Sequence, residues 1–96
     1  MHTEVRGIHV DVTQKMKDLF QKELHKLDFA KDIIVDLLFT VSREKSSYKL
    51  EVTLNFRWGT SAHIGTDSFD FDEGVNALFD KIEAKVIKEK EKVQQH

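Results

Sequence analysis

Two segments of the chain repeat hydrophobic residues at the spacing of a helix face. The segment 14–27 places them at Met16, Leu19, Phe20, Leu24 and Leu27. Thr13 stands just before this segment as a natural N-cap. The segment 71–93 places them at Val75, Leu78, Phe79, Ile82, Val86 and Val93. Asp70 precedes Glu73 by three residues, as in a capping box. The pattern therefore predicts two amphipathic helices, of which the second is longer.

Four further segments have the composition of β-strands. The segment 3–12 is short and β-branched, with Gly7 allowing an irregular exit, and 32–44 is densely apolar, as in a central strand. The segment 46–57 alternates strictly between apolar and polar residues, and 60–68 follows as a weaker strand. The apolar face of the alternating segment carries Tyr48, Leu50, Val52, Leu54 and Phe56. We expect this face to share one core with the two helical stripes.

The turns between these segments set the topology. Hairpins at 44–47 and at Trp58-Gly59 predict that the last three strands form an antiparallel meander. The first strand reaches the second through a helix, which favours parallel pairing. The prediction is an α+β fold of order β-α-β-β-β-α, in which a four-stranded sheet carries both helices on one face and leaves its other face polar.

Composition narrows the class of protein. The 96 residues suit a single domain, 1–96, and no proline or low-complexity run suggests a linker. Because the chain has no cysteine and no apolar run of membrane-spanning length, we expect a cytoplasmic protein without membrane contact. The net charge is only −2, so affinity for a polyanion depends on where the charges lie.

The lysines of the second predicted helix are not spread evenly around it. At about 100° per residue, four of them fall in one sector beside the apolar stripe, whereas Lys90 lies outside that sector and Glu89 intrudes beside it. The four are Lys81, Lys85, Lys88 and Lys92. The acidic residues on the opposite flank are Asp80, Glu83 and Glu91. The charges of this helix are thus sorted by sign.

The first predicted helix repeats this asymmetry with Lys15, Lys22 and Lys26. If the helices lie side by side, the two lysine sets would border a shared basic groove suited to a phosphate backbone. The alternative is that the lysines form solvated faces, favour the helix dipole and pair with glutamates four residues away. Periodicity alone leaves both interpretations open.

Three motifs give the chain a family resemblance. They are "RGIHVDVT" with Gly7, Val10, Val12 and Thr13, the Lys26-Leu27 pair in "KELHKLDF", and the terminal helix from Asp80 to Lys92. Together with the order of strands, these motifs resemble the short ribosome hibernation promoting factor family, which also includes the ribosome-associated inhibitor of translation. The resemblance covers essentially the whole chain.

The resemblance implies a fold like that of the double-stranded RNA-binding domain. It also implies binding to the small ribosomal subunit, in the channel where mRNA and tRNAs would lie, and hence silencing of translation. The chain is similar to the short form without a C-terminal dimerisation domain, so a role in ribosome dimers would need a second hibernation factor. An alternative function, in line with an older label of the family, is a protein-interaction module that modulates an alternative sigma factor through the sheet face or an edge strand.

Carried over by position, the resemblance assigns rRNA contacts to Lys26, Lys81, Lys88, Lys90 and Lys92. Lys22 and Lys85, on the same helical sectors, are expected to join them and to compensate for lost charge. The chain departs from the family at Glu23 and Ala84, where relatives commonly carry Lys or Arg, and at Glu89, which replaces a frequent His. We expect these departures to affect affinity more than fold.

Other chemistry finds little support. The five histidines are scattered without zinc-like spacing, and no phosphate loop or nucleophile motif is present, so neither an enzyme, a cofactor, a metal site nor a small-molecule substrate is expected. Helix capping explains the acidic stretch from Asp67 to Glu73 better than Mg²⁺ binding does. Arg57 and Trp58 at a hairpin tip could stack on a base, or Trp58 could cap the edge of the core.

Overall fold

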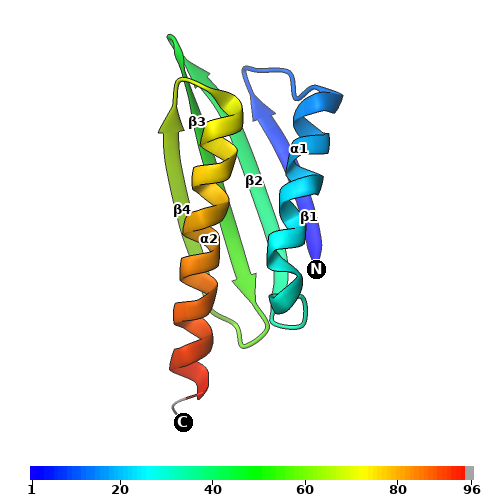
Figure 1. Cartoon of the computed structure of the whole chain (residues 1–96), viewed down its shortest axis with the longest axis vertical. Coiled ribbons are helices and arrows are strands. Elements are labelled where there is room, and N and C mark those ends of the chain that lie inside the picture. The colour runs from blue at the N-terminus through cyan, green and yellow to red at the C-terminus, as the bar shows by residue number, and fades with distance from the viewer. Residues whose placement is uncertain (95–96) are drawn as a thin grey trace.

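The computed structural model describes residues 1–94, so His96, one of the five histidines considered as metal ligands, lies outside the described residues. The expected order of elements is confirmed (Figure 1). The elements are β1 (His2–Ile8), α1 (Gln14–Leu24), the 3-10 helix η1 (His25–Ala30), β2 (Ile34–Glu44), β3 (Ser47–Phe56), β4 (Ser61–Ser68) and α2 (Phe71–Gln94).

The four strands form one sheet in the order β1-β2-β3-β4. β1 pairs with β2 in parallel because α1 crosses over between them, and the other two pairs are antiparallel. In this register Val5, Phe39, Val52 and Ile64 lie in one row across all four strands. The predicted topology is therefore confirmed, including its single parallel pair.

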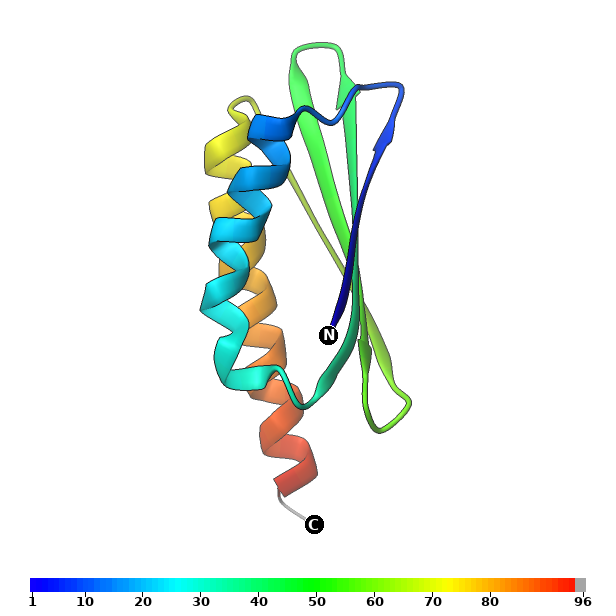
Figure 2. The same cartoon turned by 90° about the vertical axis from the view of Figure 1, so that its right-hand side faces the viewer.

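Both helices cover the same face of the sheet and run in the same direction (Figures 1 and 2). Phe20 of α1, Phe39 of β2 and Phe79 of α2 form the centre of the core, with ring centroids 4.8–6.4 Å apart. The opposite face is polar, and on it Asn55 Nδ2 donates a hydrogen bond to Asp36 Oδ2 at 3.1 Å.

The predicted core residues lie where the periodicity placed them. Fully buried are Phe20, Leu27, Leu50, Val52, Leu54, Phe56, Val75, Leu78, Phe79, Ile82 and Val86. Partly buried against them are Met16, Leu19, Leu24 and Tyr48. Val93 repeats the helical spacing of the α2 stripe but lies outside this core. Its side chain is 45% exposed, because α2 runs on beyond the end of the sheet (Figure 1).

Three element boundaries differ from the sequence prediction. β1 ends at Ile8 rather than near Val12, because the chain turns out of the sheet at His9, whose φ is +56°. β2 starts at Ile34, two residues later than expected. The α-helix ends at Leu24, and the rest of its predicted range continues as η1.

The 3-10 segment is accompanied by side-chain pairs at a spacing of three residues. Asp28 pairs with His25 at 3.4 Å and with Lys31 at 3.3 Å, each three residues away. Side chains at this spacing lie directly above one another in a 3-10 helix. Leu27 and Ala30, also three residues apart, both point into the core. The spacing of Leu27 therefore fits both kinds of helix, and the sequence pattern did not separate them.

The predicted helix caps are present, one of them in part. Thr13 Oγ1 accepts a hydrogen bond from the Met16 N–H at 3.2 Å. Asp70 Oδ2 accepts one from the Glu73 N–H at 3.0 Å, but the Asp70 N–H donates to Ser68 Oγ at 3.2 Å rather than to the Glu73 side chain. Half of the expected capping box is thus replaced by a serine of β4.

Candidate nucleic-acid interface

Lys81, Lys85, Lys88 and Lys92, which we call the lysine row, follow one side of α2. The Lys81 Nζ donates a hydrogen bond to the Gly65 carbonyl of β4 at 3.1 Å, so this side of the helix lies over the outer edge strand. From Lys81 to Lys92 the row covers 11 residues, or about 16 Å of helix. The sector predicted from the sequence is therefore one continuous side of the helix, and it lies next to β4.

The other side of α2 lies next to α1 and is acidic. Lys26 Nζ lies 2.7 Å from Glu23 Oε2. This contact raises the pKa of Lys26, and the nearby charges of Asp80 and Glu83 act in the same direction. Lys26, in η1, therefore faces carboxylates from α1 and from α2.

The expected shared basic groove is consequently wrong. Lys15 of α1 lies beside Asp72 of α2, and Lys26 of η1 lies near Asp80 of α2, whereas the lysine row is on the opposite side of that helix. The physical reason is packing, because burial of the apolar stripe of α2 on the sheet turns the lysine row toward β4 and the acidic flank toward α1 and η1. The basic surface is therefore narrower than predicted and belongs to α2 alone.

Glu89 sits within the lysine row and engages two of its members. Its Oε1 lies 3.1 Å from Lys85 Nζ and 3.5 Å from Lys92 Nζ, and its side chain is only 14% exposed. The hydrogen bond from Lys85 lowers the pKa of Glu89, so the carboxylate stays ionised. Within residues 1–94, Lys88 is the member of the row that makes no ion pair or side-chain hydrogen bond.

Glu23 has a role that the sequence did not reveal. The residue is only 7% exposed, so its carboxylate is not the solvated charge that its residue type suggests. Its close partner is Lys26, one of the lysines expected to touch RNA. Glu23 therefore pairs with one of the lysines that were expected to touch RNA.

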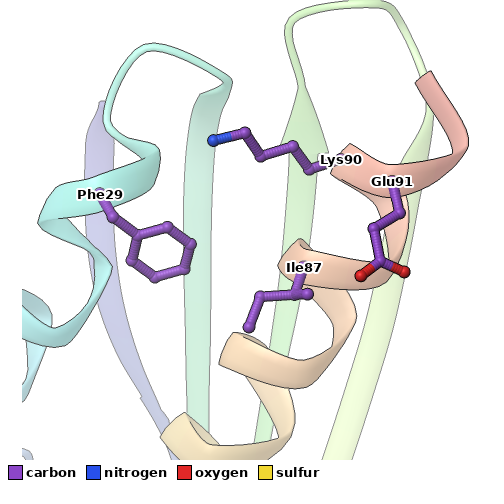
Figure 3. Close-up of a pocket in the computed structure, with 4 residues that line it drawn as sticks. All are labelled: Phe29, Ile87, Lys90 and Glu91. Carbon is purple, nitrogen blue, oxygen red and sulfur yellow. The ribbon is translucent and has the colours of Figure 1, made fainter. Parts of the chain in front are cut away.

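The remaining predicted lysines lie apart from the row. Lys22 is exposed on α1. Lys90 projects toward η1, where it lines a shallow cavity with Phe29, Ile87 and Glu91 (Figure 3). The seven candidate residues thus occupy three places, and the row holds four of them.

The hairpin tip favours the structural interpretation of Trp58. Its ring stacks on Phe56 with centroids 5.3 Å apart and an interplanar angle of 2°, and it packs against the core. The adjacent Gly59 has a φ of +93°, which explains the turn. Among residues 1–94 no group of three or more His, Asp or Glu side chains could hold a metal ion, and no helix there is long and apolar enough to cross a membrane.

Comparison with known proteins now places the chain. The family described as sigma 54 modulation protein / S30EA ribosomal protein matches residues 3–94. The chain belongs to this family. Its relatives include the ribosome hibernation promoting factor of Pseudomonas putida, which is 30% identical over 94 residues, covering 98% of this chain and 91% of that protein. The factor of the same name from Escherichia coli K12 is 24% identical over the full length of both chains.

Two solved structures share the fold. A ribosomal subunit interface protein from Coxiella burnetii superposes with a TM-score of 0.87 at 23% identity, over 94% of this chain and 98% of that one. The N-terminal domain of Thermus thermophilus Protein Y superposes with a TM-score of 0.79 at 18% identity, over 90% of this chain and 96% of that one. Membership in the hibernation promoting factor family agrees with the expectation of a binding protein rather than an enzyme.

Proposed function

We propose that the protein binds the small ribosomal subunit and silences translation by occupying the channel that mRNA and tRNAs would use. The observation that carries this proposal is the lysine row, which puts four ammonium groups on one side of α2 in a chain of net charge −2. The names of the relatives, ribosome hibernation promoting factor and ribosomal subunit interface protein, support a ribosomal partner. The mechanism is competition for space and needs no chemical step.

The physical basis of binding is counterion release. Each lysine that neutralises an RNA phosphate releases a condensed cation, so the logarithm of the binding constant falls with the logarithm of the salt concentration by about 0.7–0.9 per contact. Lys85 and Lys92 must break their ion pairs with Glu89 before they contact a phosphate. Lys88 has no ion pair to break within residues 1–94. A ribosomal partner also places the protein in the cytoplasm.

The test is binding of purified small subunits over a series of salt concentrations. The variant changes Lys81, Lys85 and Lys88 to Gln, and its matched control changes the same number of exposed lysines elsewhere, at Lys17, Lys31 and Lys49. We expect the row variant to bind more weakly and to show a slope shallower by up to about one unit per lysine that contacts phosphate. Equal binding of the two variants at every salt concentration would refute the proposal.

The sigma 54 description of the family gives a second candidate function, modulation of a sigma factor by protein contact. Such contact through the free edge of β4 meets an obstacle, because Lys81 already occupies the Gly65 carbonyl on that edge. The two functions differ in their response to salt. Binding to small subunits that weakens steeply with salt favours the ribosome, whereas salt-insensitive binding to a sigma factor favours the alternative.

A further inference from the structure

An apolar cavity opens between η1 and the last turns of α2, on the side of the helix away from the lysine row. It has a volume of about 440 Å³ and is lined by Phe29, Ile87, Lys90 and Glu91. The Phe29 ring and the Ile87 side chain face each other across it, and Lys90 reaches over its opening toward η1 (Figure 3). We call it the Phe29 cavity.

The two apolar side chains are unusually accessible. Phe29 is 46% exposed and Ile87 is 48% exposed, although most large apolar residues of the chain are buried. η1 directs Leu27 and Ala30 into the core, which leaves Phe29 on its outer side. Adjacent exposed apolar side chains with a polar rim are typical of a binding surface rather than of a packing defect.

We propose that the Phe29 cavity takes one unpaired base of the RNA, so that the protein reads single-stranded or looped RNA and not only phosphate charge. This inference rests on the proposed function, because the RNA is that of the small subunit. The Phe29 ring supplies a stacking face, Ile87 supplies an apolar wall, and the Lys90 ammonium neutralises the phosphate of the same nucleotide.

The polar rim favours a nucleotide over an apolar protein side chain. A base is always attached to a phosphate, which gives the Lys90 ammonium a partner, whereas a leucine or phenylalanine of a protein gives it none. Glu91 also lines the cavity, but its carboxylate lies on the other side of Ile87 from the Phe29 ring (Figure 3). Phe29, Ile87 and Lys90 therefore each have a role in binding one nucleotide.

A base in this cavity also defines the kind of RNA that fits. In a double helix the bases are stacked on one another and their faces are hidden, so only a looped, bulged or terminal nucleotide can enter. The lysine row lies on the far side of α2, so the RNA would pass around the protruding end of this helix. The last turns of α2 extend beyond the sheet and leave room for such a path (Figures 1 and 2).

The experiment compares Phe29 variants in binding to purified small subunits over a salt series. Phe29→Ala should weaken binding about 5- to 150-fold, the loss that stacking of one base supplies, with the salt slope unchanged because stacking releases no counterion. Phe29→Tyr should bind like the wild type, since it keeps the ring. Phe29→Leu should bind as weakly as Phe29→Ala, since it keeps apolar volume and a folded core but lacks a flat face.

Phe69→Ala is the matched control. Phe69 is 81% exposed in the turn between β4 and α2, at the other end of the molecule, and its loss should leave binding unchanged. The inference is overturned if Phe29→Ala binds like the wild type, or if Phe29→Leu does, because the latter would indicate an apolar protein contact. Failure of the wild type itself to bind in a salt-dependent way would instead overturn the proposed function.

Discussion

Glu89→Gln should make the protein bind the small subunit more tightly. Glu89 holds Lys85 at 3.1 Å and Lys92 at 3.5 Å, and both ion pairs must open before these lysines can meet phosphate. Glutamine keeps the shape of the side chain but removes the charge. The substitution therefore frees two members of the lysine row without touching any lysine.

The size of the effect follows from the energy of the two pairs. Ion pairs at the protein surface contribute about 0.2–1 kcal/mol each, so the wild type gives up about 0.4–2 kcal/mol on binding that the variant does not. At 1.4 kcal/mol per factor of ten, the variant should bind about 2- to 30-fold more tightly. The salt slope should stay about the same, because the same lysines contact phosphate in both proteins and release the same number of counterions.

The assay is fluorescence anisotropy of labelled protein titrated with small subunits at several salt concentrations. Glu73→Gln is the control, because it removes one negative charge from the first turn of the same helix, far from the row. If Glu89→Gln gains no more affinity than Glu73→Gln does, the lysine row is not limited by Glu89 and the reasoning fails. The same variant should unfold slightly more easily in urea, because two surface ion pairs are lost.

Three further predictions concern the fold. Phe79→Ala removes a buried ring that packs on Phe20 and Phe39, and it should lower the free energy of unfolding in urea by about 3–5 kcal/mol; a loss below about 1 kcal/mol would contradict the packing. Gly7→Ala would place a methyl group on the Val10 carbonyl oxygen, and a thermal melt should show a loss of about 1–3 kcal/mol. The hydrogen bond to Glu23 raises the pKa of Lys26 above its usual 10.5, so its stabilisation is complete below that pH and is lost as the pH rises through the raised value. The stability difference between wild type and Glu23→Gln should therefore shrink in alkaline denaturation, and a constant difference would refute the pairing.

Elements with a strong period could be predicted from the sequence. The strict alternation over 46–57 specified β3 and its buried face, and the hairpin turns specified the meander. The lysine sector of α2 and the intrusion of Glu89 followed from the angle of 100° per residue. A sequence pattern contains these features because each depends on a single element or on the turn between two consecutive strands.

Features that depend on neighbouring elements could not be predicted in this way. A helical projection gives angles about one axis, but it does not say that β4 lies on one side of α2 and α1 on the other, so the shared basic groove was wrong. The projection also does not show where the sheet ends. Val93 lies beyond that end and is exposed. Packing buries Glu23, although glutamate is a residue type that is mostly exposed. Phe29 lay outside the helical pattern and gave no signal.

The charges at the two ends of α2 affect how the protein meets its target. The first turn of the helix holds Asp72 and Glu73, and its last turns hold Lys88, Lys90 and Lys92 with Glu89 and Glu91 between them. The molecule is 46 Å long, and the screening length in physiological salt is about 8 Å, so a negative surface acts on whichever end is nearest and not on the net charge of −2. Such a surface turns the particle during its approach, repelling the acidic end and drawing in the lysine end. We expect the protein to approach such a surface with the C-terminal end of α2 leading. We also expect its association rate to increase as the salt concentration falls, although a net charge of −2 alone would predict repulsion.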